Sequence, residues 1–104
     1  MPTHHPDLDR VAVEDVLAAL GNPVRISIVR ELAGSAGPRS CGSLPVEVTK
    51  ATATHHWRVL RENGLTRESR SGREKQITLR AAELDARFPG LLAAVLAAAP
   101  PREP

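Results

Sequence analysis

A helix that leads directly into a β-hairpin, over residues 49 to 79, most constrains the fold that this chain can adopt. Thr49 is a natural N-cap, and Asn63-Gly64 predicts the end of the helix, because glycine is preferred just past a helix. Two extended runs follow, "LTRESR" and "REKQITL", joined at Ser71-Gly72, which is a hairpin signal. Helical spacing separates the residues of the helix into two faces. The apolar face holds Ala53, His56, Trp57 and Leu60, and the polar face holds Lys50, Thr54, His55, Arg58 and Arg61.

Two further helices are predicted before this segment. Apolar residues recur at helical spacing over residues 8 to 20, and Gly21-Asn22 stops this first helix. Asn22 then caps a second helix with Pro23 at its first position, and Gly34 closes it. The second helix is predicted to turn three charged residues toward water, namely Arg25, Arg30 and Glu31.

The segment between the second helix and Thr49 is less regular. Residues 35 to 43, "SAGPRSCGS", consist of turn-forming residues and are predicted to form a loop. Residues 44 to 48, "LPVEV", fit either a strand or a short helix, and the sequence leaves both open. Residues 81 to 98 return to a helical pattern, interrupted at Pro89-Gly90. This last segment has more apolar residues than one small core can absorb, which indicates a partner surface.

Composition limits the chain to one domain of 104 residues with a modest core. Aromatic residues make up only 2%, so the core must be built from Leu, Val, Ile and Ala, and a small aliphatic core favours an obligate dimer. No apolar run approaches the ~20 residues of a membrane span, and the N-terminus lacks the apolar core of a signal peptide. Cys41 is the single cysteine, which suits a reducing compartment. We expect a cytoplasmic protein.

Positive charge is concentrated in one third of the chain. Residues 50 to 80 hold eight Lys and Arg residues against three Glu, while the whole chain has a net charge of +2, so the remainder is net negative. The eight cations are Lys50, Arg58, Arg61, Arg67, Arg70, Arg73, Lys75 and Arg80. Such asymmetry is typical of a protein that presents one face to a polyanion.

The predicted order of elements is helix, helix, an undecided short element, helix, basic hairpin, helix. This is the order of a winged helix-turn-helix, a mostly α (α+β) fold with a two-stranded wing. We expect residues 8 to 98 to form this DNA-binding and dimerisation domain, with a flexible N-terminal tail at 1 to 7 and a C-terminal tail at 99 to 104.

Three linked motifs resemble the ArsR/SmtB family of bacterial transcriptional regulators. "LAALGNPVRISIVREL" resembles the opening helix pair of the family, with its Leu-x-x-Pro-x-Arg-x-x-Ile pattern. "VTKATATHHWRVLRENGLTR" resembles the segment from the recognition-helix cap to the wing, and "RSGREKQITL" resembles the wing itself. The resemblance covers roughly residues 14 to 80. It implies a homodimeric DNA-binding regulator, usually a repressor, that dimerises through its first and last helices on a near-palindromic operator.

The chain departs from the family pattern where some members bind metals. The helix before the turn, here "SLPVEVT", is short and contains a proline, and the Cys-x-Cys metal box is absent. Trp57 replaces the usual leucine, and the usual tyrosine of the wing is missing. Asp85 has no histidine partner in the last helix, since no histidine follows His56. The resemblance therefore implies the fold and DNA binding but leaves the signal undetermined.

The recognition helix and the wing supply the predicted DNA contacts. A helix fits the major groove, and side chains on its exposed face reach base edges. On the helix these residues are Lys50, Thr52, Thr54, His55 and Arg58. On the wing they are Arg70, Arg73 and Lys75, whose side chains reach phosphates or a minor groove. His56, on the face of Trp57, is predicted to be packed and hydrogen bonded.

The N-terminus "MPTHHPD" is a candidate metal site. Removal of the initiator methionine would place His4 third in the chain, where an amine, backbone amides and an imidazole can wrap Ni²⁺ or Cu²⁺ in a square plane. His5, Asp7 and Asp9 could add ligands or join a site with the partner subunit, and nickel is the favoured ion. A solvated terminus is the competing interpretation. Cys41, with no second thiol, is interpreted as inert.

Two classes of function remain open from the sequence. The first is a DNA-binding regulator, for which a response to metal is a further expectation. The second is a winged-helix module that binds a partner protein, which would carry the sensing function. An enzyme is not expected, because the sequence offers no nucleophile–base pair, paired acids or glycine-rich phosphate loop.

Overall fold

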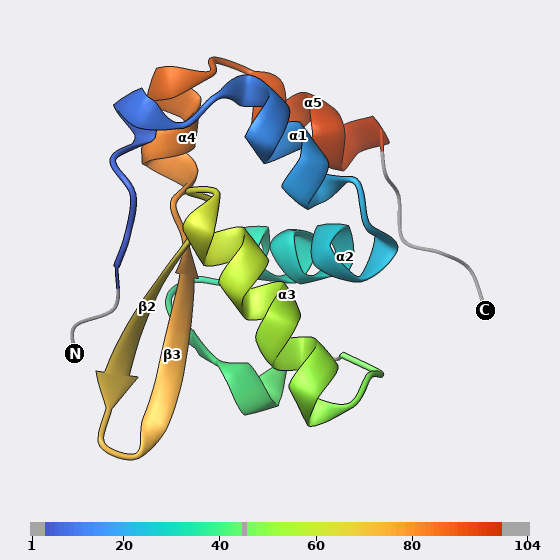
Figure 1. Cartoon of the computed structure of the whole chain (residues 1–104), viewed down its shortest axis with the longest axis vertical. Helices are drawn as coiled ribbons and strands as arrows, with labels where there is room; N and C mark the ends of the chain where they lie inside the picture. The colour runs from blue at the N-terminus through green and yellow to red at the C-terminus, as the bar shows by residue number, and fades with distance from the viewer. Residues whose placement is uncertain (1–3, 45, 99–104) are drawn as a thin grey trace.

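The computed structural model describes residues 4–44 and 46–98, which form five α-helices, two short 3-10 helices and a three-stranded sheet (Figure 1). In chain order the elements are η1 (Leu8–Arg10), α1 (Val13–Leu20), α2 (Pro23–Ala33), β1 (Arg39–Ser40), η2 (Cys41–Ser43), α3 (Lys50–Glu62), β2 (Thr66–Ser71), β3 (Glu74–Leu79), α4 (Ala81–Arg87) and α5 (Leu91–Ala98). Helices α1, α4 and α5 gather at one end of the long axis, and the β2–β3 hairpin extends toward the other (Figure 1). This is the predicted winged-helix arrangement.

The capping residues predicted from sequence begin the two central helices. The Asn22 side chain accepts hydrogen bonds from the backbone N–H groups of Val24, at 2.9 Å, and Arg25, at 3.1 Å. Thr49 accepts from the N–H of Thr52 at 3.2 Å, so α3 starts at Lys50 as expected. In both cases a side chain satisfies N–H groups that have no partner within the helix.

The prediction of a single helix over residues 8 to 20 is wrong. The chain forms the short η1, passes through extended backbone at Val11 and Ala12, and only then enters α1. The break lets Leu8 and Val11 pack on Gly64, at the end of α3. A Cβ at Gly64 would lie 2.5 Å from Leu8 Cδ2, and the φ of +82° at Gly64 also favours glycine.

The region between α2 and α3 also differs from the predictions. Part of the expected loop at 35 to 43 forms strand β1, whose residues Arg39 and Ser40 pair with Ile77 and Gln76 of β3. Residues 44 and 46–49 contain neither a helix nor a strand, so this part of the chain forms neither of the two alternatives that the sequence left open. The 3-10 turn η2 precedes it.

The hairpin has the predicted strands but a turn one residue later. Ser71 pairs with Glu74, so the two-residue connection is Gly72-Arg73 rather than Ser71-Gly72. Gly72 has a φ of +65°, the left-handed conformation that tight hairpin turns require. Arg73 is therefore the second residue of the turn itself.

The core is aliphatic, as composition predicted. Its fully buried side chains include Leu60, Leu65, Ile77, Val16 and Val29. Trp57 retains only 7% exposure and joins this core from α3. No helix among residues 4–44 and 46–98 has both the length and the apolar character needed to cross a membrane.

Candidate nucleic-acid interface

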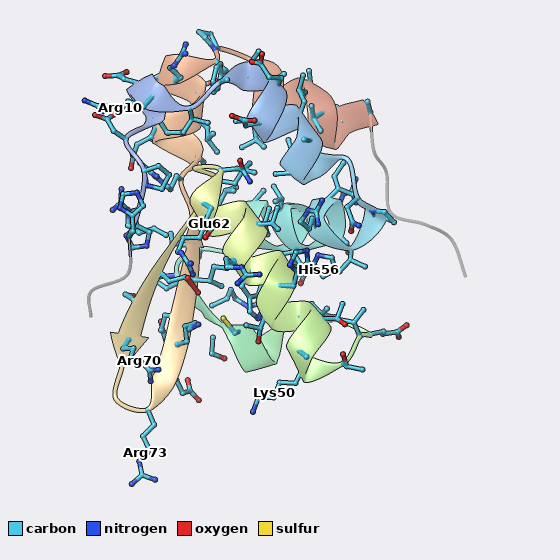
Figure 2. All side chains as sticks on the ribbon, in the orientation of Figure 1. Arg10, Lys50, His56, Glu62, Arg70 and Arg73 are labelled. Atoms are coloured by element: carbon cyan, nitrogen blue, oxygen red, sulfur yellow. The ribbon has the colours of Figure 1, made fainter. Side chains whose placement is uncertain are left out.

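Helix α3 has one buried and one exposed face. His56, Trp57 and Leu60 are buried against the core. The five residues predicted to contact DNA from this helix are all exposed, and they are Lys50, Thr52, Thr54, His55 and Arg58. Lys50 projects from the first turn of α3, and Arg73 extends from the hairpin tip at the same end of the molecule (Figure 2). The first turn of α3 and the tip of the wing thus lie toward the same end of the long axis of the molecule (Figure 2).

The basic residues of the segment 50 to 80 divide into two sets. Four make ion pairs with glutamates: Arg61 and Lys75 with Glu68, and Arg67 and Arg80 with Glu83. The other four are exposed and make no ion pair within the described residues. These four are Lys50, Arg58, Arg70 and Arg73. Within this segment, the charge without an ion pair therefore belongs to α3 and the wing, while Arg10 and Arg87 are exposed elsewhere on the molecule.

Lys75 differs from the other residues predicted to contact DNA. Its Nζ lies 3.3 Å from Oε1 of Glu68, whose side chain is only 2% exposed. The side chain of Lys75 keeps 40% exposure, so part of it faces water. Its charge is partly compensated by a buried carboxylate that it shares with Arg61, unlike that of Arg73.

His56 is packed and hydrogen bonded, as predicted. Its Nδ1 lies 3.2 Å from NH1 of Arg25, and the Arg25 Nε donates to the carbonyl of Ala19 at 2.6 Å. Burial, followed by the charges of Arg25 and His55, lowers the pKa of His56. Its neutral ring accepts from Arg25 and does not face a ligand.

The prediction that Arg25, Arg30 and Glu31 face water is wrong for the two arginines, which are half-buried and donate to backbone carbonyls. The Glu31 side chain keeps 44% exposure. Arg25 joins the end of α1 to α3 through Ala19 and His56. The sequence placed Arg25 in a helix and in the family motif but did not predict these contacts, because the partners lie six and thirty-one positions away.

The N-terminal metal candidates do not cluster in the described residues. Among residues 4–44 and 46–98 no three His, Cys, Asp or Glu side chains lie close enough to hold a metal ion. His5 Nε2 accepts a hydrogen bond from the backbone N–H of Glu68 at 2.9 Å, and Asp7 Oδ1 accepts from the N–H of Asp9 at 3.0 Å. His4 is exposed, and the amine and first amides of the predicted square plane lie outside the described residues.

His5 also ties the predicted tail to the domain. Its ring caps an N–H of β2, and Arg80 NH1 donates to the carbonyl of Pro6 at 2.8 Å. Burial, together with the charges of Arg67 and Arg80, lowers the pKa of His5. A neutral His5 can accept the N–H of Glu68, whereas a protonated ring cannot.

Cys41 lies on η2, half-buried at the edge of an open hollow of about 350 Å³ that Lys50, Trp57 and Lys75 also line. Burial and the nearby Glu68 carboxylate raise the pKa of the Cys41 thiol. The thiol therefore stays protonated near neutral pH, which agrees with the expectation that it is unreactive.

A second surface of the molecule is apolar. Val13 and Leu17 of α1 are 40% and 46% exposed. On α5 none of the residues is fully buried, although Leu91, Leu92, Val95 and Leu96 contact the core. The apolar residues expected in excess over residues 81 to 98 thus pack in part on the core. Helices α1 and α5 both lie at the end of the molecule away from the wing (Figure 1).

Comparison with known proteins places this geometry in a family. Residues 20–69 match a helix-turn-helix domain. YceK of Bacillus subtilis (strain 168), an uncharacterised HTH-type transcriptional regulator, is 34% identical over 79 residues, which cover 74% of this chain and 79% of that protein.

Solved structures agree with this match. An ArsR-like transcriptional regulator from Rhodococcus sp. RHA1 is 27% identical, with a TM-score of 0.63 over 79% of this chain and 77% of that one. The transcriptional repressor BigR from Xylella fastidiosa is 25% identical, with a TM-score of 0.65 over 86% of this chain and 88% of that one. Because it has the wing and the capped α3 and is similar to these proteins, the chain belongs to the ArsR-like family of winged helix-turn-helix transcriptional regulators.

Proposed function

We propose that this protein is a homodimeric repressor that binds a specific, near-palindromic DNA operator. The observation that carries the proposal is the placement of Lys50, Arg58, Arg70 and Arg73. All four are exposed on α3 or the wing and make no ion pair within the described residues. In this mode α3 enters the major groove and the wing arginines contact phosphates or the adjacent minor groove.

In this proposal the exposed polar face of α3 recognises the bases. The Thr54 hydroxyl donates to the carbonyl of Lys50 at 3.0 Å and keeps its lone pairs for a base or a phosphate. His55 is exposed beside it and can donate to a base edge. Lys50 and Arg58 can contact guanine or phosphate.

Dimerisation gives the exposed apolar residues a function. Val13 and Leu17 on α1, together with the half-buried residues of α5, supply a surface for a second copy of the chain. A two-fold axis through this surface would present two α3 helices to DNA. They would fit half-sites about one helical turn, ~34 Å, apart. Repression is proposed because BigR, one of the similar proteins, is a transcriptional repressor.

Selection from a randomised pool of DNA duplexes tests this proposal. The full-length protein should enrich a sequence with two inverted half-sites, and its affinity should fall steeply with salt, because phosphate contacts release counterions. The rival function is a module that binds a partner protein. Failure to enrich any sequence, combined with salt-insensitive capture of a protein on the α3 face, would favour that rival.

A further inference from the structure

We infer that Glu68, a buried carboxylate on β2, sets the position of the wing relative to α3 and thereby controls how well the protein distinguishes its operator from other DNA. This inference rests on the proposed function. In this proposal Glu68 does not contact DNA itself but acts through Arg61 and Lys75, so it is a positioning residue.

Glu68 occupies a position where the hairpin packs on the domain. It pairs with Ile77 of β3, and residues directly opposite each other in an antiparallel pair lie on the same face of the sheet. Ile77 is fully buried, and Glu68 is 6% exposed. A charged residue is unfavourable at such a position unless it is paired, so a specific interaction must compensate the burial.

Two cations from two different elements supply that interaction. NH1 of Arg61, on α3, lies 2.6 Å from Oε2 of Glu68 and donates a short charge-assisted hydrogen bond. Nζ of Lys75, on β3, lies 3.3 Å from Oε1. Glu68 therefore links the last turns of the recognition helix directly to both strands of the wing.

The position of Arg61 makes the link relevant to DNA binding. Arg61 is three residues beyond Arg58 on α3, and its side chain is only 20% exposed because it turns toward β2. The Arg61–Glu68 hydrogen bond and the Lys75–Glu68 ion pair hold the hairpin at the Glu68–Ile77 pair, between its base at Thr66–Leu79 and its tip, and so restrain the direction in which the tip points. That tip carries Arg70 and Arg73, which are both exposed.

Glu68 also removes positive charge from the surface that DNA would meet. Without its carboxylate, Arg61 and Lys75 would both be able to turn outward and contact phosphates. Such contacts raise affinity for every sequence alike, because the phosphate backbone carries no sequence information. Glu68 thus acts on selectivity in two ways, by orienting the wing and by restraining two nonspecific contacts.

The test is Glu68→Gln in the full-length protein, a change that keeps the shape and removes the charge. Binding is measured to the duplex that the wild type enriches from a randomised pool and to a random duplex, each across a salt series. Affinity for random DNA should rise a few-fold, and its salt slope should steepen by up to about one unit. The ratio of operator to random affinity should fall about five-fold or more, the range of one lost recognition contact.

Glu62→Gln is the matched control. Glu62 also neighbours Arg61, at 3.9 Å, but its side chain is 56% exposed and makes no contact with the wing among the described interactions. The control removes the same negative charge without breaking the link. It should raise affinity for both duplexes alike and leave their ratio unchanged.

Arg61→Lys provides a second route if Glu68→Gln does not fold. Lysine keeps the charge but cannot reproduce the guanidinium geometry, so the ratio should fall while random binding stays the same. An unchanged ratio in both variants overturns the inference, and so does an equal loss of affinity for both duplexes. If the wild type itself enriches no sequence, the proposed function fails before any variant is measured.

Discussion

NH1 of Arg25, on α2, lies 3.2 Å from Nδ1 of His56, on α3. The same guanidinium donates to the carbonyl of Ala19, at the end of α1, at 2.6 Å. The Arg25 side chain therefore connects α1, which carries the exposed apolar residues, to α3, which carries the exposed basic face. Because His56 has to be neutral to accept this hydrogen bond, the connection depends on pH.

Stability is expected to rise with pH in the range below about 6.5, the ordinary pKa of histidine. Burial lowers the pKa of His56, so the unfolded chain binds a proton more readily than the folded one. Stability is complete above the unfolded pKa and is lost as the pH falls toward the folded pKa. Urea unfolding of the wild type and of His56→Gln across this range measures the effect, and the variant should show the weaker dependence.

Two comparisons isolate the contribution of His56. His5 has a lowered pKa for a similar reason, so His5→Gln should remove a further part of the pH dependence. His4→Gln changes an exposed histidine of the N-terminal segment, which is not among the groups that shift the pKa of His56, and serves as the control. An identical pH dependence in the wild type and His56→Gln would contradict the role assigned to the Arg25–His56 contact.

Features set by short-range chemistry could be predicted from the sequence. Thr49 caps α3 as predicted, because its hydroxyl needs only an N–H three residues away. The hairpin was predictable for the same reason, since Gly72 supplies the positive φ of the turn. The break in the first helix was not, because it depends on Leu8 packing on Gly64, far along the chain.

In the candidate site, too, the residue types could be predicted from the sequence, whereas their contacts with other elements could not. The sequence identifies eight cations between residues 50 and 80 but treats them as equivalent. Only the fold distinguishes Lys75, which pairs with Glu68, from Arg73, which extends from the turn. The single signal for Glu68 was an acidic residue on the packed face of the hairpin, and its partner Arg61 lies on another element.

The wing and the recognition helix should differ in what they contribute to binding. Arg73→Ala should weaken binding to operator and random DNA alike and reduce the salt slope by about one unit, because it removes a phosphate contact. Thr54→Ala or His55→Ala should instead lower the preference for the operator, by about 1–3 kcal/mol per lost base contact. Titrations of both duplexes across a salt series measure both quantities.

Arg67→Ala is the matched control for the wing. Arg67 lies on β2 of the same hairpin, but its NH2 is 3.2 Å from Oε1 of Glu83, so its charge is already paired. We expect a smaller change in the salt slope than for Arg73→Ala. Equal effects of all these variants on both duplexes would refute the division between wing and helix.

The apolar surface of α1 predicts a dimer that one charge can disrupt. Leu17 is 46% exposed, and Leu17→Glu would bury a carboxylate without a partner if this surface joins two chains. Sedimentation should show a dimer for the wild type and a monomer for the variant, with weaker binding to an operator of two half-sites. Ser27→Glu adds the same charge on the exposed part of α2 and should remain dimeric. A wild-type monomer at concentrations that saturate the operator would contradict the dimer.

Nickel binding at the N-terminus stays a prediction, and the fold gives it a specific consequence. His5 Nε2 already accepts the N–H of Glu68 at 2.9 Å, so a metal ion bound by this nitrogen must release that hydrogen bond. Nickel should therefore alter DNA binding through the wing, and a chelator should reverse the change. His4→Ala and His5→Ala should both weaken nickel binding measured by calorimetry, whereas His55→Ala, on α3, should not. Equal nickel affinity in the wild type and the two N-terminal variants would rule out the site, because neither imidazole could then be a ligand.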